Sequence, residues 1–581
     1  MESTTLQDKI KYWTENEYFD PQTRQELLSI TDPKELAERF CCDLAFGTAG
    51  IRGILGAGSN RLNIYWIRRV VQGLADTIKE AGQEAIQRGV VIAHDCRRYS
   101  REFARESALV LAANGIKAYL FDSLRPTPEL SFAIRHLRTI AGIMITASHN
   151  PKEYNGCKVY WEDGGQVPPE QANRIVAKME ERGSWIVDTV SEEEARARGL
   201  LVAVGEEVDE SYLAEIKKQL LNLPLARERG QNLCLVFTPL HGTGGRLVPQ
   251  LLRDVGFTSL VVVEEQAVPD TEFSTVSVPN PEEPAAFDLA LKYAQQNEGD
   301  LILATDPDAD RLGVMVKDRE GQYHKLTGNQ IGVILLHYLL SQRQKQGRLP
   351  SDGIVMKSIV STDLAAQVAA GFGVKLLDVL VGFKYIGEQI KRLEEEGTGT
   401  YLFGFEESHG YLAGTYARDK DAVQAAALVA EAALYYQEVE GKTLLDVLEE
   451  IYQTYGYYLD EQVAMSFPGL EGKEKINRLM ANLRALDQNT IGGVPLVSQE
   501  DYWSGQGWRV EDEQEYPLSL PRSNLLRFSF QGGGYAMARP SGTEPKIRFY
   551  FCVRGETQQE ARERLAAVKE EFLRLAGVNS L

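Results

Sequence analysis

One pattern occurs three times in this chain of 581 residues: a strand, a helix, a glycine and a second strand. The three runs span residues 90–121, 233–265 and 354–380. In each run the glycine follows the last apolar turn of the helix, where a helix commonly stops. Two strands joined through a helix predict a parallel pair with a right-handed crossover. We therefore expect three similar α/β domains.

Each run is followed by a helical segment and a further strand that ends in a polar loop. These strands are residues 141–146, 300–305 and 400–405, and the loops after them read ASHNP, DPDADR and EESHG. Ligands of open α/β sheets collect at the carboxyl ends of strands. Three such domains facing one cleft would bring these loops together.

The carboxyl-terminal part of the chain breaks this pattern. A helix at 442–456 has the character of a connector, and strands around LRFSF and IRFYFCV precede a closing helix. This arrangement predicts a smaller α+β domain. The fold class expected is thus three similar α/β domains with mixed sheets and one smaller α+β domain. Their expected bounds are 1–205, 206–322, 323–445 and 446–581.

Composition narrows the class of protein. Hydrophobic residues make up 43% and charged residues 25% of the chain, which is ordinary for a globular protein. The net charge of −20 repels nucleic acid and anionic lipid. No apolar run approaches the ~18 residues of a membrane span, and the first residues lack the features of a secretory signal. Six cysteines without a CxxC pair predict reduced thiols. We expect a cytoplasmic protein with no nucleic-acid or membrane partner.

The first polar loop contains a serine at the point where the chain turns. Segment 146–158 reads TASHNPKEYNGCK, with Ser148 next to His149 and with Lys158 at its end. A serine needs a nearby base or a metal to take part in group transfer, and Lys158 offers an acid/base or phosphate partner. Ser148 as a turn residue and His149 as a packed ring are the structural alternatives. A G-x-S-x-G elbow is absent, which argues against a hydrolase triad.

The second polar loop carries three alternating carboxylates, Asp306, Asp308 and Asp310. Acids this close repel one another, and a bound hard cation explains their order best. The segment is not an EF-hand, because its sixth position is Arg311 rather than glycine and its twelfth is Lys317 rather than glutamate. A solvated acidic turn is the alternative. Three ligands leave room for a phosphate oxygen, which Arg311 is placed to hold.

The third polar loop, GFEESHG at 404–410, offers paired acceptors that suit sugar hydroxyls, in Glu406, Glu407 and Ser408. Lys420 adds a cation downstream. A surface acidic turn explains the segment equally well.

Two glycine-containing segments are suited to anions. RPSGTEPK at 539–546 combines backbone N–H groups, hydroxyls and cations as a phosphate nest, although it is not a Walker P-loop. FGTAGIRG at 46–53 is a flexible polar loop able to approach an anion closely.

Taken in order, FGTAGIRG, TASHNP with NGCK, DPDADR, GFEESHG and RPSGTEPK resemble the five landmarks of the α-D-phosphohexomutase family, over nearly the whole chain. The amino-terminal extension, and GFEESHGY followed by ARDKDA, are most similar to the bacterial α-phosphoglucomutase branch. The resemblance implies four domains around a central cleft. It also implies an isomerase, an intramolecular phosphotransferase that interconverts α-D-glucose 1-phosphate and glucose 6-phosphate through a phosphoserine and glucose 1,6-bisphosphate.

The resemblance assigns roles to residues of this sequence. Ser148 would carry the phosphoryl group, and the three aspartates would hold one Mg²⁺ with the phosphoserine as a further ligand. Arg52, His149 and Lys158 would assist proton transfer and charge stabilisation. Glu406 and Ser408 would bind sugar hydroxyls, and the RPSGTEPK loop with Lys420 would hold the phosphate that is not reacting. The full set of expected substrate contacts is Thr48, Arg311, Gly382, Lys384, Glu406, Ser408, Lys420, Arg539, Ser541, Gly542 and Thr543.

Two positions depart from the family pattern. Val381 stands where the family often has threonine before Gly-Phe-Lys, which puts one hydroxyl contact to the substrate in question. Ala422 stands where glycine is usual, a change of little expected consequence.

Several alternatives stay open from sequence. One alternative is another mutase of the same family, whose substrate is a phosphate of mannose, glucosamine or a pentose. A metal-dependent sugar phosphatase would hydrolyse the phosphoserine, and a non-catalytic binder would only hold a sugar phosphate. The expected partner is a phosphosugar, and the chain is expected as a monomer or a homodimer.

Overall fold

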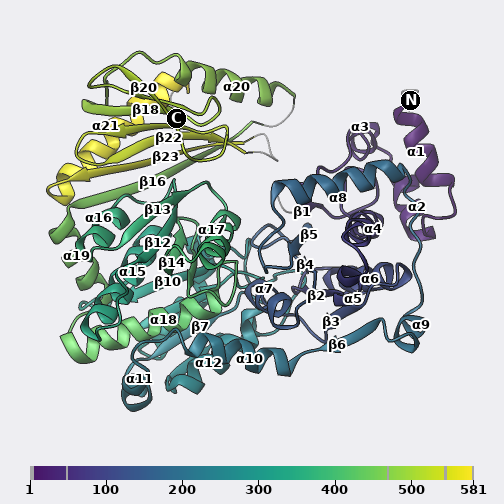
Figure 1. Cartoon of the computed structure of the whole chain (residues 1–581), viewed down its shortest axis with the longest axis horizontal. Helices are drawn as coiled ribbons and strands as arrows, with labels where there is room; N and C mark the ends of the chain where they lie inside the picture. The colour runs from purple at the N-terminus through teal and green to yellow at the C-terminus, as the bar shows by residue number, and fades with distance from the viewer. Residues whose placement is uncertain (1–4, 48–49, 468–469, 542–545, 579–581) are drawn as a thin grey trace. The chain divides into compact units, whose positions relative to one another are not determined.

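The computed structural model describes residues 5–47, 50–467, 470–541 and 546–578 (Figure 1). Its contacts divide the chain into two compact units. The first unit comprises Met1–Lys325, Gly387–Glu395 and Gly410–Tyr435, and the second comprises Leu326–Ile386, Glu396–His409 and Tyr436–Leu581. Within the described ranges, no helix combines the length and the apolar character needed to cross a bilayer.

The first sheet of the first unit has six strands in the order β1-β5-β4-β2-β3-β6. Strand β2 pairs parallel with β3 and β4, whereas β5 runs antiparallel to β4 and β1. Every residue of β2 and β4 is buried, as expected for strands covered on both faces. The strands are β1 Gly50–Ile54, β2 Val90–His94, β3 Ala118–Phe121, β4 Ala141–Ile145, β5 Tyr154–Trp161 and β6 Leu201–Val204.

Helices cover both faces of this sheet. Helices α6 (Ser100–Ala113) and α7 (Thr127–His136) both contact β2 and β4, and they lie on opposite sides of these strands in Figure 1. Helix α4 (Ile64–Glu80) packs on α6 and on α8 (Pro169–Arg182). Trp13 of α1 (Leu6–Glu15) stacks on Phe19 and contacts Tyr65 of α4, which attaches the amino-terminal helices. The remaining helices of this part are α2 Pro21–Ser29, α3 Pro33–Glu38, α5 Gln83–Arg88 and α9 Glu192–Ala197.

The second sheet of the first unit has the order β11-β10-β9-β7-β8. Strand β7 pairs parallel with β8 and β9, whereas β10 runs antiparallel to β9 and β11. Helix α18 (Ala422–Tyr435) contacts α12 (Gly244–Val255), β9 and β10. The strands are β7 Leu235–Thr238, β8 Leu260–Val262, β9 Leu301–Thr305, β10 Leu312–Lys317 and β11 Tyr323–Lys325. The other helices are α10 Glu206–Lys217, α11 Leu223–Arg229, α13 Glu264–Ala267 and α14 Asp288–Gln296.

The second unit contains a third parallel core. Strand β12 (Gly353–Ser358) lies between β13 (Lys375–Val379) and β14 (Thr400–Glu406) and is parallel to both. Helix α15 contacts β14, and α16 contacts β13. The helices here are α15 Gly328–Lys345, α16 Leu364–Gly371 and α19 Leu444–Tyr455, whereas Gly387–Glu395 of α17 (Phe383–Glu396) belongs to the first unit. Strand β15, Gly410–Ala413, belongs to the first unit.

The second unit also contains an eight-stranded sheet in the order β16-β23-β22-β21-β18-β19-β20, with β17 paired to β18. All of its pairs are antiparallel. Phe572 of α21 (Gln558–Ala576) packs against aromatic rings of β21 and β23, and α20 spans Leu470–Arg484. The strands are β16 Tyr457–Ser466, β17 Thr490–Ile491, β18 Val494–Asp501, β19 Gln506–Arg509, β20 Gln514–Pro517, β21 Leu526–Phe530, β22 Gly534–Pro540 and β23 Lys546–Gly555.

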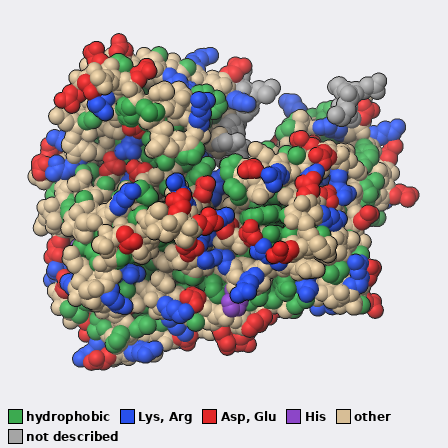
Figure 2. Space-filling view, in the orientation of Figure 1, with side chains coloured by type: hydrophobic (Ala, Val, Ile, Leu, Met, Phe, Trp, Pro, Cys, Tyr) green, Lys and Arg blue, Asp and Glu red, His purple; other side chains and the backbone are tan. Residues whose placement is uncertain are grey.

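The predicted fold class is confirmed. Three mixed or parallel α/β sheets are followed by a β-rich α+β domain. The strands that precede the three polar loops are β4, β9 and β14, and each pairs parallel with the first strand of its run. On the face drawn in Figure 2, acidic and basic side chains are interspersed, so the net charge of −20 is not gathered in one acidic patch there.

Candidate active site

Ser148 lies in the loop after β4, residues 146–153, here called the serine loop. Its φ of +52° places it in the left-handed region, which a residue other than glycine adopts only when its surroundings hold it there. The backbone N–H of Ser148 donates to Thr146 Oγ1 at 2.8 Å. Ser148 is buried, and its Oγ donates to Asp306 Oδ2 at 2.7 Å and lies 3.2 Å from His149 Nδ1.

The three aspartates of the loop between β9 and β10 converge. Each offers an oxygen, and these oxygens lie within 4.8 Å of one another. Asp306 Oδ1 accepts the backbone N–H groups of Asp310 at 3.1 Å and Arg311 at 3.0 Å, which closes the loop around the carboxylates. We call Asp306, Asp308 and Asp310 the aspartate trio.

The aspartate trio fits a divalent metal ion. All three residues are buried, yet Asp308 Oδ1 and Asp310 Oδ1 accept no hydrogen bond from any described residue. A buried carboxylate oxygen without a partner carries a large desolvation penalty, which a cation removes. Carboxylate oxygens are the donors that Mg²⁺ and similar hard cations prefer.

Two lysines from different parts of the first unit face the trio. Lys158 of β5 places its Nζ 2.7 Å from Asp308 Oδ2 and 3.4 Å from Asp310 Oδ2. Lys420, just before α18, places its Nζ 2.7 Å from Asp310 Oδ2. The backbone N–H of Ala422 donates to Ala309 O at 3.1 Å, which ties this segment to the aspartate loop. Both ammonium groups therefore neutralise the carboxylates directly.

The pKa values of the three aspartates shift in different directions. Burial and the charges of Asp308 and Asp310 raise the pKa of Asp306 well above its ordinary value. Burial also opposes ionisation of Asp308 and Asp310, but the lysines outweigh it and lower the pKa of both carboxyls. Burial lowers the pKa of Lys158, but the charges of Asp308 and Asp310 raise it by more, so the pKa lies above its ordinary value. Lys158 is thus firmly protonated, and Asp306, the acid that faces Ser148, is the one that most readily holds a proton.

The remaining predicted residues of the first unit surround these groups. Burial, then the charges of Arg311 and Arg52, lower the pKa of His149 well below its ordinary value, so its ring is neutral at neutral pH. Arg52 of β1 donates to Asn150 Oδ1 at 2.8 Å. Arg311 pairs with Glu282, and its Nε lies 3.8 Å from Asp310 Oδ1.

The predicted sugar contacts Gly382, Lys384, Glu406 and Ser408 lie in the second unit. The backbone N–H of Gly382 donates to Glu406 Oε1 at 2.8 Å, and Glu406 is almost fully buried at the end of β14. Lys384 lies in the first turn of α17, with its Nζ 5.0 Å from the ring centroid of Tyr385. Ser408 is partly buried and follows β14.

The predicted phosphate nest is only partly described. Arg539 lies on β22 opposite Arg548, and the N–H of Ser541 donates to Lys546 O at 2.7 Å. Thr48, Gly542 and Thr543 fall outside the described residues.

Sequence reasoning missed two residues that contact the site. Thr127 begins α7, and its Oγ1 donates to Asp308 Oδ2 at 2.8 Å while its N–H donates to Asp308 O at 2.9 Å. Asp419 lies beside Lys420 and accepts from Tyr160 OH at 2.8 Å. The signal for Thr127 was its place at a helix start after β3, and the signal for Asp419 was the charged segment ARDKDA.

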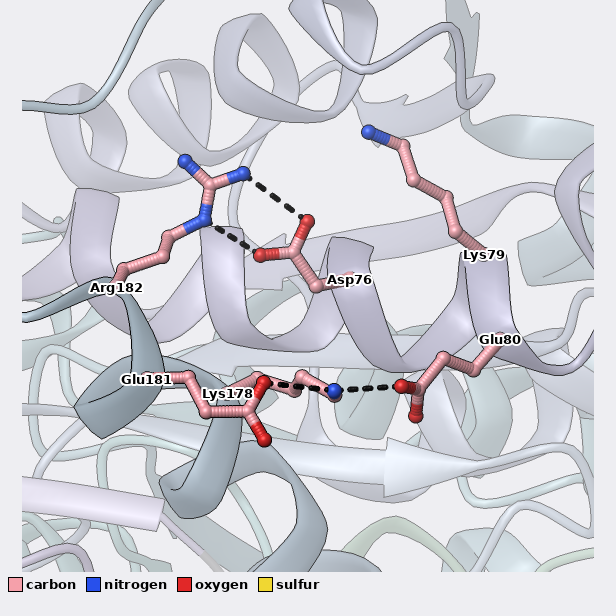
Figure 3. Close-up of a pocket in the computed structure, with 6 residues that line it drawn as sticks. All are labelled: Asp76, Lys79, Glu80, Lys178, Glu181 and Arg182. Atoms are coloured by element: carbon pink, nitrogen blue, oxygen red, sulfur yellow. Dashed lines mark hydrogen bonds and ion pairs between the residues drawn. The ribbon is translucent and has the colours of Figure 1, made fainter.

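A separate surface cavity of 340 Å³ lies between the carboxyl-terminal ends of α4 and α8 (Figure 3). Two of its three cations are paired with its acids: Arg182 Nε bonds Asp76 Oδ2 at 2.6 Å, and Lys178 Nζ bonds Glu181 at 2.9 Å and Glu80 at 2.5 Å. The third, Lys79, donates to Asn114 Oδ1. The cavity contains none of the predicted site residues.

Models of the Phosphoglucomutase/phosphomannomutase alpha/beta/alpha domains I, II and III match residues 43–184, 210–321 and 327–455. The chain is 40% identical over 514 residues to a phosphoglucomutase of Staphylococcus haemolyticus, covering 88% of this chain and 91% of that protein. It is 38% identical over 537 residues to a phosphoglucomutase of Staphylococcus aureus strain USA300, covering 92% and 94%.

Two solved structures share the fold. A putative phosphomannomutase from Thermus thermophilus matches with a TM-score of 0.67 at 23% identity, over 92% of this chain and 99% of that one. Parafusin, a phosphoglucomutase from Paramecium in its open form, matches with a TM-score of 0.69 at 18% identity, over 92% and 96%. With these matches, the chain belongs to the phosphoglucomutase/phosphomannomutase family, the phosphohexomutases, which are intramolecular phosphotransferases of the isomerase class.

Proposed function

We propose that this enzyme interconverts α-D-glucose 1-phosphate and glucose 6-phosphate, with Ser148 as the residue that carries the phosphoryl group. The observation that supports this most strongly is the 2.7 Å contact between Ser148 Oγ and Asp306 Oδ2 in a buried, oxygen-rich cluster. Phosphoserine would transfer its group to the free hydroxyl of the sugar, giving glucose 1,6-bisphosphate. The intermediate would reorient in the site, and its other phosphate would then be transferred to Ser148.

The aspartate trio is the proposed site of one Mg²⁺ ion, with an oxygen of the phosphoserine as a further ligand. The two carboxylate oxygens that accept no hydrogen bond from described residues, Asp308 Oδ1 and Asp310 Oδ1, support this. When bound, a divalent ion supplies Lewis-acid stabilisation of charge on the transferring phosphoryl group.

Proton movement is assigned to His149 and charge stabilisation to the cations. When phosphate returns to the enzyme, a P–O bond forms at Ser148 Oγ and the P–O bond to the sugar breaks, leaving its electron pair on the sugar oxygen. The Oγ proton must leave, and the sugar oxygen must take up a proton to become a hydroxyl. His149 Nδ1, 3.2 Å away on a neutral ring, is the acceptor in the tautomer that leaves this nitrogen unprotonated. Lys158, Arg52 and Arg311 would stabilise the phosphoryl oxygens as charge builds on them.

The sugar and the distal phosphate are assigned to loops of the second unit. Glu406 and Ser408 would bind sugar hydroxyls, with Gly382 and Lys384 beside them. Arg539, Ser541, Gly542 and Thr543 would hold the phosphate that is not reacting, since hydroxyls, backbone N–H groups and a guanidinium suit a dianion. Thr48 is proposed as a further phosphate contact. Lys420, which faces Asp310, is proposed to reach substrate phosphate from the same position.

Other features of the proposal concern the whole chain. We propose functional domains at 1–205, 206–322, 323–445 and 446–581, and a monomer or homodimer. A cytoplasmic site of action follows from the substrate class, because sugar phosphates are charged and do not cross lipid bilayers.

Mannose phosphate is the second candidate substrate, since the matching family models cover phosphomannomutases as well. The test is kcat/KM of the purified chain for the 1-phosphates of glucose, mannose, glucosamine and ribose, with Mg²⁺ and a trace of glucose 1,6-bisphosphate. Highest kcat/KM with glucose 1-phosphate supports the proposal. A higher value for another sugar reassigns the substrate, and release of inorganic phosphate at the rate of sugar phosphate turnover identifies a phosphatase.

A further inference from the structure

Arg97 is a buried cation that the proposed chemistry does not use. It lies in the loop after β2, and its side chain is 0% exposed. Its guanidinium donates to four backbone carbonyls of one short segment. Nη2 donates to Ser148 O at 2.6 Å and also to Asn150 O, and Nη1 donates to Pro151 O at 2.8 Å and to Tyr154 O at 3.0 Å. One side chain thus holds the carbonyls on both sides of the turn in the serine loop.

Arg97 is itself held by Asp95. Arg97 Nε lies 3.3 Å from Asp95 Oδ2, and the same oxygen accepts from Thr146 Oγ1 at 2.7 Å. Thr146 Oγ1 in turn accepts the N–H of Ser148. Both backbone groups of Ser148 are therefore linked to the carboxylate of Asp95. Thr146 links the N–H, and Arg97 links the C=O.

The serine loop needs such support for two reasons. The left-handed conformation of Ser148 costs about 1 kcal/mol or more for a non-glycine residue. The buried carbonyl of Ser148 and the part-buried carbonyls of Asn150, Pro151 and Tyr154 also need donors, and Arg97 supplies one to each. Arginine offers five N–H donors in a fixed plane, whereas lysine offers three on one atom and cannot span four separated carbonyls.

The loop between α13 and α14 lies against Arg97. The Arg97 guanidinium carbon lies 5.1 Å from the ring centroid of Phe273, a stacking distance for a cation on an aromatic face. The neighbouring Glu272 pairs with Lys152 at 3.1 Å and with Arg98. This cover keeps water from competing for the carbonyls that Arg97 holds.

We propose that Arg97 is a positioning residue for phosphoryl transfer: it fixes the backbone of the serine loop so that Ser148 Oγ points at Asp306. The inference rests on the proposed function of Ser148. It gives Arg97 no contact with the substrate, so it predicts loss of the chemical step and not of substrate binding. A displacement of about 1 Å at a reacting atom costs about 100-fold in rate.

The test compares the full-length chain with Arg97→Lys, Arg97→Ala and the control Arg105→Ala, which removes an exposed arginine of α6 that pairs with Glu192. With glucose 1-phosphate as substrate, both Arg97 variants are expected to lose about 100-fold in kcat while KM stays within about twofold. Low concentrations of guanidinium are expected to restore part of the kcat of Arg97→Ala and to leave the wild type and Arg105→Ala unchanged.

A second measurement separates this inference from the proposed function. The rate at which glucose 1,6-bisphosphate phosphorylates Ser148 is followed by mass spectrometry in a single turnover, and it is expected to fall in both Arg97 variants. If the wild type is active and Arg97→Lys has the same kcat, the inference about Arg97 is overturned and the proposed function stands. A rise in KM at constant kcat in the Arg97 variants overturns the inference in the same way. If Arg97→Ala does not fold, Arg97→Lys decides, provided its thermal unfolding matches that of the wild type. No turnover in the wild type overturns the proposed function, and the inference falls with it.

Discussion

Ser148 and Asp306 lie 158 residues apart in the chain and on loops of two different sheets, yet Ser148 Oγ donates to Asp306 Oδ2 at 2.7 Å. The serine loop follows β4 and the aspartate loop follows β9, so the contact depends on how the two sheets of the first unit pack. Thr127 of α7 and Lys158 of β5 also bond Asp308 in the loop after β9. The proposed reacting group is thus joined to the proposed metal ligands across this interface, and Thr127 and Lys158 bond the same ligands from the side of the serine loop.

Removal of Lys158 is expected to destabilise the protein and to slow turnover. In Lys158→Met, Asp308 keeps its hydrogen bond from Thr127 but loses the cation that faces it, and a buried carboxylate that loses its charged partner costs about 3–5 kcal/mol. The free energy of unfolding, measured by denaturant titration without added metal, is expected to fall by that order. Added Mg²⁺ is expected to recover more stability in this variant than in the wild type, because the divalent charge replaces the lost one.

The matched control is Lys178→Met, which removes a surface lysine of α8 that pairs with Glu80 and Glu181. Exposed pairs are worth about 0–1 kcal/mol, so little change is expected. Equal stability of Lys158→Met and Lys178→Met would show that Lys158 does not neutralise the trio.

Magnesium is expected to bind more tightly when Ser148 is phosphorylated. The trio with Lys158 and Lys420 carries a net charge near −1 when all five groups are ionised, and a phosphoserine adds about −2. Calorimetric titration of the phosphorylated and dephosphorylated protein with Mg²⁺ measures the difference. Chelation is expected to stop turnover, and Mg²⁺ to restore it.

Asp308→Asn tests the same cluster by removing one charge. One charge at ~4 Å is worth about 4 kcal/mol at an effective dielectric constant of 20, so at least about tenfold weaker Mg²⁺ binding is expected. Asp318→Asn, on the turn after β10, serves as the control and is expected to bind as the wild type does. Identical Mg²⁺ affinity for the wild type, Asp308→Asn and Asp318→Asn would show that the aspartate trio is not the metal site.

Asp460 of β16 is expected to make the stability of the second unit depend on pH. It pairs with Cys552 across the sheet, and burial raises its pKa from 3.8 to about 6. Because the folded pKa lies above the unfolded one, the ionised carboxylate is penalised in the folded state. The penalty is absent below about pH 4 and grows as pH rises through 6, to the order of 2–3 kcal/mol.

Asp460→Asn removes this titration. Its free energy of unfolding is expected to exceed that of the wild type at pH 7.5 and to approach it at pH 4, as measured by urea titration at both pH values. Asp512→Asn, whose exposed carboxylate pairs with Arg509, is expected to show no such crossover. A loss of stability in Asp460→Asn at pH 7.5 would contradict the assignment.

The parts of the site that sequence predicted are those encoded locally. Ser148 and the aspartate trio each follow a buried strand and carry their chemistry within a few residues, so strand position and residue type located them. The contact of Lys420 with Asp310 depends instead on α18 packing against β9 and β10, which no local pattern specifies. Arg97 was overlooked for a similar reason, because its partners are backbone carbonyls, which leave no mark in the sequence.

The most direct measurement is the mass of the tryptic peptide 139–152, which contains Ser148, after incubation of the protein with glucose 1,6-bisphosphate and Mg²⁺. We expect this peptide to gain one phosphate on Ser148, and to lose it when glucose 6-phosphate is added in excess. Ser148→Ala is expected to take up no phosphate and to show no mutase activity. Mutase activity in Ser148→Ala, or phosphate on another residue in the active wild type, would contradict the central role of Ser148.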